Sequence, residues 1–136
     1  MKKYWLFLDD VRIPSDVGHY ISNRIYFGDR WVIVRSYDEF VSMITERFEN
    51  GEWPELISYD HDLAIEHYEP ENQTLSLNEY YERTNRAETG YDCLRWLILF
   101  SYENNLPFPE SYCHSMNPIG KKNIEQLIQA QRARKR

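Results

Sequence analysis

The feature that most constrains the fold is the alternation of short apolar segments with longer segments of helical periodicity. The apolar segments are rich in β-branched and aromatic residues, which is typical of strands covered on both faces. Because helices separate most of them, the strands are expected to be joined by crossovers and to run parallel. The sequence predicts a three-layer α/β fold with a parallel sheet of about four strands. The predicted strands are residues 4–8, 31–34, 56–59 and, more weakly, 111–113.

Capping residues mark the expected helix ends. Ser36 and Glu39 have the spacing of a capping box, and the Asn-Gly pair at 50–51 is typical of a helix end. Thr89 is a candidate N-cap for the next helix, and Asn117 followed by a proline predicts the start of the last one.

Two stretches interrupt the alternation. Residues 11–30 take the place of the helix expected between the first two strands, and their pattern does not assign a structure. Residues 63–88 form a long insertion, in which Ser76 and Glu79 have capping-box spacing and predict a short helix through the tyrosines that follow. The insertion is interpreted equally well as a lid over a site or as a decoration of the surface.

Length and composition favour one domain, residues 1–136, with an insertion at 63–88 and a basic C-terminal helix end. Apolar residues make up 42% of the chain and aromatic residues 15%, which excludes a disordered protein. Residues 4–8 are too short an apolar run for a signal peptide or a membrane span, so we expect a cytoplasmic protein without a membrane partner. Cys93 and Cys113 are too few for a disulfide scaffold.

The charge is unevenly distributed. The net charge is −6, yet four of the last five residues are cations, and without them the balance is 12 cations against 22 anions, or −10. Such an acidic body repels a nucleic-acid backbone, so nucleic acid is not the expected partner. An anionic substrate would need local cations or a metal.

Residues that can carry chemistry follow each predicted strand. In a parallel sheet the carboxyl ends of the strands lie at one edge, where ligands bind, so we expect these residues to converge. Clustered carboxylates repel one another and raise each other's pKa, and a hard divalent cation such as Mg²⁺ or Mn²⁺ relieves that repulsion. The residues are Asp9, Asp10, Arg12, Arg35, Ser36, Asp60, His61, Asp62, His114 and Ser115.

Each of these features also has a purely structural interpretation. Asp9-Asp10 can close a turn, because aspartate bonds its own backbone locally. Thr89 fits an N-cap better than a ligand contact. Asn117 is a good cap, but the free N–H groups of the same helix start can also bind an anion. The hypothesis of a site rests on the convergence of several such signals.

Four blocks in order resemble the cyclic-phosphate-processing receiver-like domain family, a divergent branch of the receiver fold of response regulators. The resemblance spans nearly the whole chain, and the last block is its most specific part. It implies a flavodoxin- or receiver-like fold and a metal-dependent phosphoesterase activity on cyclic phosphates. The blocks are residues 8–14 (LDDVRIP), 58–63 (SYDHDL), 89–92 (TGYD) and 114–120 (HSMNPIG).

The sequence departs from the family pattern at several points. Ala64 stands where the family usually has glycine, and the insertion at 63–88 is unusually long. An ordinary receiver continues to a fifth strand preceded by a lysine that contacts the phosphoryl group. Lys121 and Lys122, in the first turn of the last helix, are candidate substitutes for that lysine.

The resemblance and the strand-end cluster together predict a hydrolase for a small-molecule cyclic phosphate, such as a cyclic nucleotide or a nucleotide-derived cyclic phosphate. The expected metal ligands, for Mg²⁺ or Mn²⁺, are Asp9, Asp10 and Asp60, and Asp62 would assist them or activate water. His114 is the expected acid for the leaving oxygen, a role that His61 could take instead. The expected phosphate-binding residues are Arg12, Arg35, Thr89, Ser115, Asn117 and Lys121.

Two other functions fit the same residues. The chain could be a signalling receiver phosphorylated on Asp60, or a non-catalytic binder that sequesters a cyclic nucleotide in phage or prokaryotic defence. A homo-oligomer is compatible with each of these functions.

Overall fold

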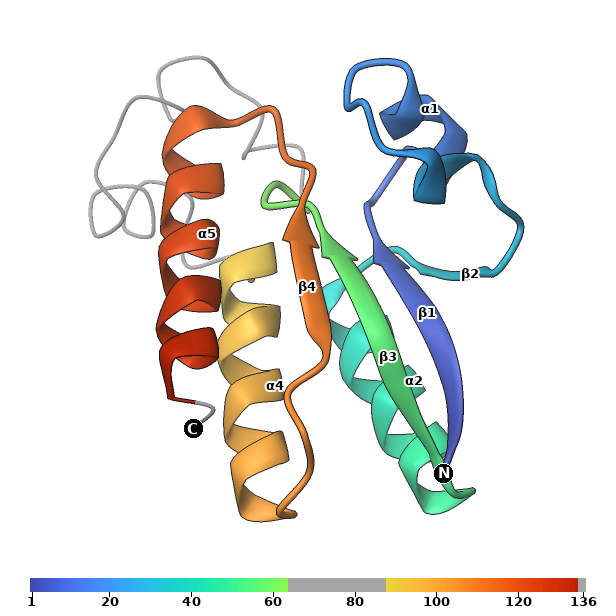
Figure 1. Cartoon of the computed structure of the whole chain (residues 1–136), viewed down its shortest axis with the longest axis vertical. Helices are drawn as coiled ribbons and strands as arrows, with labels where there is room; N and C mark the ends of the chain where they lie inside the picture. The colour runs from blue at the N-terminus through green and yellow to red at the C-terminus, as the bar shows by residue number, and fades with distance from the viewer. Residues whose placement is uncertain (64–87, 135–136) are drawn as a thin grey trace.

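The computed structural model of the chain describes residues 1–63 and 88–134 (Figure 1). Most of the predicted insertion, including Ser76, Glu79 and Ala64, lies outside the described residues. The elements in chain order are β1 (Lys2–Leu8), α1 (Pro14–Gly18), the 3₁₀ helix η1 (Arg24–Phe27), β2 (Trp31–Val34), α2 (Tyr37–Glu49), β3 (Glu52–Tyr59), α4 (Gly90–Glu103), β4 (Glu110–Cys113) and α5 (Pro118–Ala133).

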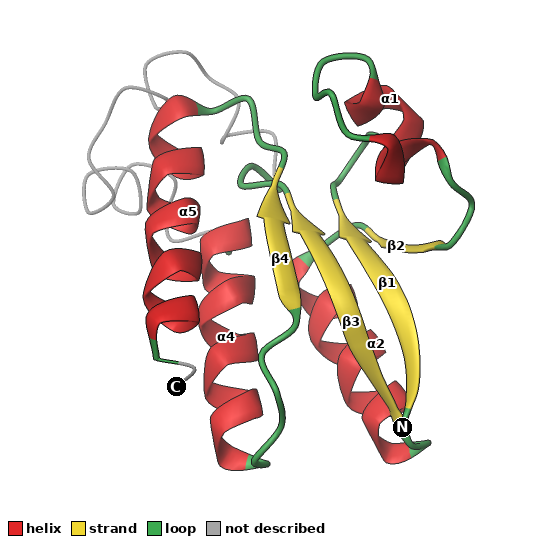
Figure 2. Ribbon diagram, in the orientation of Figure 1, coloured by secondary structure: helices red, strands yellow, loops and turns green. Residues whose placement is uncertain are grey.

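The four strands form one parallel sheet in the order β2-β1-β3-β4, which confirms the predicted fold class (Figure 2). β1 and β3 are longer than predicted because each begins with polar residues that the apolar pattern did not include. Pro54 lies inside β3, and the register with β1 shifts between Tyr4 and Trp5. This irregularity accommodates a residue that cannot donate a ladder hydrogen bond. In this order β3 lies between the strands that carry Asp9 and His114.

One face of the sheet packs against α2, α4 and α5 and holds the larger core. The predicted caps are present: Ser36 Oγ accepts from Glu39 N, and Gly51 has a φ of +81° just beyond α2. The Glu39 carboxylate accepts from Arg35 N rather than from Ser36 N, so the capping box closes one residue earlier than its spacing predicted. Asn117 Oδ1 accepts from the N–H groups of residues 119 and 120 and starts α5.

The opposite face is covered by residues 11–30, the stretch to which the sequence pattern did not assign a structure. It folds into α1 and η1, and Figure 1 shows α1 beside the carboxyl end of β1, on the other side of the sheet from α5. Its small core is mostly aromatic, and Tyr26 stacks on Trp31 with ring centroids 5.7 Å apart. Among the described residues, no helix is long and apolar enough to span a membrane.

Candidate active site

Three strand ends bring a buried cluster together. Asp9 follows β1, Asp60 follows β3 and His114 follows β4, and one ligand atom of each lies within 4.8 Å of the others. Their exposed fractions are 0%, 2% and 0%. The predicted convergence at the carboxyl edge of the sheet therefore occurs, with His114 in the group of three.

Asp9 is held by four hydrogen bonds. Its Oδ1 accepts from the backbone N of Val11 (3.0 Å) and of Arg12 (2.8 Å). Its Oδ2 accepts from Arg12 Nη1 (3.2 Å) and His114 Nε2 (3.0 Å). Burial by itself raises the pKa of Asp9, but the hydrogen bonds from His114 and the backbone outweigh burial and lower that pKa to about 2. Asp9 is consequently a carboxylate at neutral pH.

His114 lies between two protein partners. Its Nδ1 is 2.7 Å from Ser58 Oγ, which is 2.6 Å from Tyr26 Oη, and its ring stacks on Phe7 at 4.6 Å. Burial lowers the pKa of His114, so the ring is neutral and carries one N–H.

The protonation of Asp9 determines the direction of this chain of hydrogen bonds. Because the Asp9 carboxylate can only accept, the His114 proton is on Nε2 and Nδ1 must accept. Ser58 therefore donates to His114, and Tyr26 donates to Ser58. The chain runs from Tyr26 through Ser58 and His114 to Asp9.

The pKa of Asp60 is shifted in the opposite direction to that of Asp9. Burial first, and then the charges of Asp9 and Asp62, raise the pKa of Asp60 to about 8. Arg12 Nη1 lies 3.9 Å from its Oδ2, and His61 N donates to its Oδ1 at 2.8 Å. Crowded carboxylates of this kind fit a hard divalent cation, whose charge would favour their ionised forms.

A second cluster joins the two residues that follow Asp60 in the chain, His61 and Asp62, to Asn117 at the start of α5. His61 Nδ1 is 3.2 Å from Asp62 Oδ1, and Asn117 Nδ2 donates to the same oxygen at 3.2 Å. A Cβ at Gly120 would lie 2.6 Å from His61 Nδ1, so only glycine leaves room for this imidazole. The first turn of α5 thus positions His61 and Asp62.

Gly90 brings α4 against the loop after β3. A Cβ there would overlap the carbonyl oxygen of Asp60, and Gly90 N donates to His61 O at 2.9 Å. Thr89 is the N-cap of α4 and shares a capping box with Asp92. The structural interpretation of Thr89 is confirmed, and its contact with a phosphate stays a prediction.

The remaining predicted residues have different surroundings. Arg35 Nη1 donates to the backbone oxygens of Asp9 (3.1 Å) and Arg12 (2.6 Å), so it braces the loop after β1. Ser115 Oγ accepts from Asn117 N. Asp10 is half-buried beside the group of three and is not a member of it. Lys121 Nζ lies 3.9 Å from Glu125 Oε2 on α5.

The structure adds residues that sequence reasoning did not select individually. Ser58 and Tyr26 orient the His114 ring, and Tyr20 Oη donates to the His114 backbone oxygen at 2.8 Å. The sequence did contain an indication that Ser58 belongs to the site, since it is a polar residue in an apolar strand and lies two residues before Asp60, on the same face. The two tyrosines lie in residues 11–30 and carried none.

Comparison with known protein families gives a match over most of the chain. The profile of a family described as "Cyclic-phosphate processing Receiver domain" matches residues 4–130. No curated protein and no solved structure matches the chain.

Proposed function

The chain belongs to the family of cyclic-phosphate processing receiver domains, and we propose on this basis that it hydrolyses a cyclic phosphate ester with the help of a divalent metal. The observation that carries the proposal is the buried cluster of Asp9, Asp60 and His114 at the carboxyl edge of the sheet. The raised pKa of Asp60 supports it, because a cation would offset the repulsion that raises this pKa.

Asp9 and Asp60 would hold the metal, with Asp10 beside them as a further carboxylate. Carboxylate oxygens suit Mg²⁺ and Mn²⁺, the two ions that the sequence predicted. When bound, such an ion polarises phosphoryl oxygens and lowers the pKa of bound water. His114 would orient Asp9 through its Nε2–H, as residues hydrogen-bonded to metal ligands commonly do.

Arg12 is the proposed phosphate-binding cation. Its guanidinium lies against both Asp9 and Asp60, and its side chain keeps 23% of its surface exposed. A guanidinium so placed can bind phosphoryl oxygens while it shares the carboxylates. Asp62, held by Asn117, is the proposed residue for orienting the attacking water.

The proton for the leaving oxygen would come from His114 or His61. In the metal-free protein His114 is neutral and donates its Nε2–H to Asp9, so as the acid it would first have to take up a second proton and then exchange that carboxylate for the leaving oxygen. We expect His114→Ala to lower turnover by about 10²–10⁴-fold, and His61→Ala to lower it much less. The loss should shrink with a leaving group of low pKa. Greater damage from His61→Ala would exchange the two roles.

The test is a panel of cyclic phosphates incubated with the protein and Mn²⁺ or Mg²⁺, with ring opening followed by ³¹P NMR. The panel contains nucleoside 2′,3′-cyclic phosphates, ADP-ribose cyclic phosphate and cyclic oligonucleotides. We expect a phosphomonoester or a linear phosphodiester, and no turnover in excess chelator. Full turnover in chelator would contradict the metal assignment. Recovery of bound ligand unchanged would indicate a binder, and labelling of Asp60 by acetyl phosphate without turnover would indicate a signalling receiver.

A further inference from the structure

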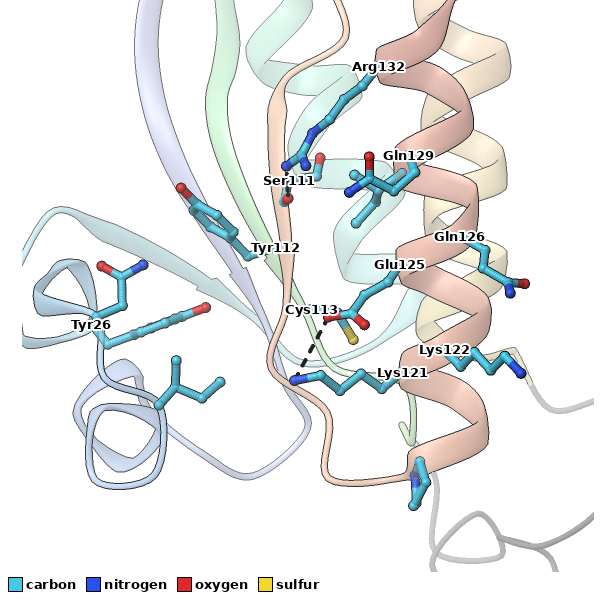
Figure 3. A pocket seen from close by; sticks show the side chains of 14 residues that line it. Tyr26, Ser111, Tyr112, Cys113, Lys121, Lys122, Glu125, Gln126, Gln129 and Arg132 are labelled. Carbon is cyan, nitrogen blue, oxygen red and sulfur yellow. Dashed lines mark hydrogen bonds and ion pairs between the residues drawn. The ribbon is translucent and has the colours of Figure 1, made fainter.

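A groove of about 810 Å³ lies along the outer edge of β4 and not over the carboxylates (Figure 3). α5 forms one wall, and residues 21–26 lie across β4 from it. This volume is within the range of small-molecule sites. The lining residues that matter below are Tyr26, Cys113, Lys121, Lys122, Glu125 and Arg132.

The floor of the groove includes backbone polar groups of β4. His114 N donates to Tyr59 O of β3, so the alternation of a strand turns the peptide groups of Ser111 and Cys113 away from β3, toward the groove. Arg132 Nη2 donates to Ser111 O at 3.2 Å, as this orientation requires. The backbone N–H and C=O groups of Cys113 therefore face the groove, the first as a hydrogen-bond donor and the second as an acceptor.

The groove is cationic on an acidic protein. Of the described residues, Lys121, Lys122 and Arg132 line it together with one carboxylate, that of Glu125, whereas the whole chain has a net charge of −6. Figure 3 shows Lys121 directed toward β4 beside Cys113. A local excess of cations concentrates anionic ligands.

A chain of hydrogen bonds that starts at Tyr26 connects the wall of the groove with the carboxylate cluster. Tyr26 lines the groove, and its hydroxyl bonds Ser58, which bonds the His114 ring. Burial raises the pKa of Cys113 to about 12, with a lowering contribution from Lys121 and a raising one from Asp60.

We propose that this groove binds the nucleoside and a second phosphate of the substrate, so that the substrate is a nucleotide with an anionic group besides the cyclic phosphate. This inference rests on the proposed function. The peptide edge of Cys113 would hydrogen-bond the base, and Lys121 and Lys122 would bind the second phosphate. An added peptide strand fits less well, because β4 spans four residues and Arg132 already bonds Ser111 O.

The test is binding of adenosine 3′,5′-bisphosphate, which has no cyclic phosphate, to ¹⁵N-labelled protein in excess chelator. We expect shifts of the backbone amides of Cys113, Lys121 and Lys122, and at least tenfold weaker binding of adenosine or inorganic phosphate alone. The double variant Lys121→Gln/Lys122→Gln should bind about tenfold more weakly. Arg134→Gln is the matched control, because Arg134 ends α5 in a different groove, and it should bind like the wild type.

The outcomes separate this inference from the proposed function. Shifts confined to the groove, without turnover of any cyclic phosphate, would support the groove and contradict the hydrolase. Turnover of cyclic phosphates without groove shifts, or an equal loss of binding in Arg134→Gln, would overturn the groove. Displacement of the bisphosphate by an acidic peptide that forms strand contacts with β4 would also overturn it, in favour of strand addition.

Discussion

The loops after β1 and β3 each begin with an aspartate, yet the two carboxylates have opposite electrostatics. Asp9 accepts four hydrogen bonds, and its pKa falls to about 2. Asp60 is as deeply buried, and burial together with the neighbouring carboxylates outweighs Arg12 and the His61 N–H, so its pKa rises to about 8. Burial is common to both, so the difference comes from the donors and charges around each carboxylate.

This comparison suggests a division of roles. In the metal-free protein, backbone and side-chain donors already compensate the charge of Asp9, so this carboxylate stays ionised and available as a ligand without a cation. The β3 end is electrostatically unfavourable when Asp60 is ionised, and a bound cation would relieve it. Changes at the two ends should therefore have opposite effects on the metal-free protein.

The largest effect is expected for Asp9→Asn. The substitution removes a buried charge that His114 and Arg12 contact, and it should lower the free energy of unfolding by about 3–5 kcal/mol. Urea unfolding in excess chelator at pH 7 measures this loss. Asp16→Asn is a control, since that exposed aspartate lies in α1 outside the cluster. A loss equal to that of the control would contradict the role of Asp9.

Asp60→Asn should have the opposite sign. The folded-state pKa of about 8 lies above the value of about 3.9 for a free aspartate. The stabilisation from protonated Asp60 is thus present below pH 4 and is lost as the pH rises through 8. We expect the variant to be more stable than the wild type by about 1–3 kcal/mol at pH 8.5 in chelator, and nearly equal to it at pH 4.

Metal should reverse this advantage. If Asp60 is a ligand, Mn²⁺ raises the melting temperature of the wild type at pH 8.5 and has little effect on the variant. A variant less stable than the wild type in chelator at pH 8.5 would contradict the electrostatic argument.

Gly120→Ala should be destabilising by about 1–3 kcal/mol, since the new Cβ would overlap the His61 ring. Removing that ring should restore part of the loss, because the His61 Cβ, 2.8 Å from the new Cβ, remains; the double variant His61→Ala/Gly120→Ala is the informative measurement. Gly90→Ala is the contrast, because its Cβ would meet the Asp60 backbone, and His61→Ala should not rescue it. Equal rescue of both variants would contradict a specific contact between residue 120 and His61, and would indicate that His61→Ala makes the loop after β3 more mobile in general.

The smallest effect is expected for Tyr26→Phe, about 0.5–1.5 kcal/mol for one hydrogen bond. We expect ¹⁵N NMR of the wild type to show His114 neutral with its proton on Nε2, and the variant to shift the Nδ1 resonance because Ser58 loses its donor. Tyr20→Phe is the matched control, since Tyr20 bonds the His114 backbone and not its ring. A proton found on Nδ1 in the wild type would overturn the direction of the chain.

Sequence reasoning predicted the sheet and the convergence of the strand ends. These follow from local patterns, because hydrophobic periodicity and caps such as Ser36 and Asn117 act over a few residues. It did not assign α1 and η1, since residues 11–30 have no regular period and are held by contacts such as Tyr26 with Trp31. The roles predicted for the site residues stay predictions.

The sequence by itself determined which residues lie at the carboxyl edge of the sheet, because the carboxyl ends of parallel strands lie together whatever their lateral order. Only the tertiary structure decided which partners those residues have. The order β2-β1-β3-β4 places β3 between Asp9 and His114, so Ser58 bonds the His114 ring while Asp60 lies among like charges. Asp9 and His114 are 105 positions apart, and no local pattern encodes their hydrogen bond. The pKa values of the two aspartates depend on such contacts, which form only when the strands pack side by side.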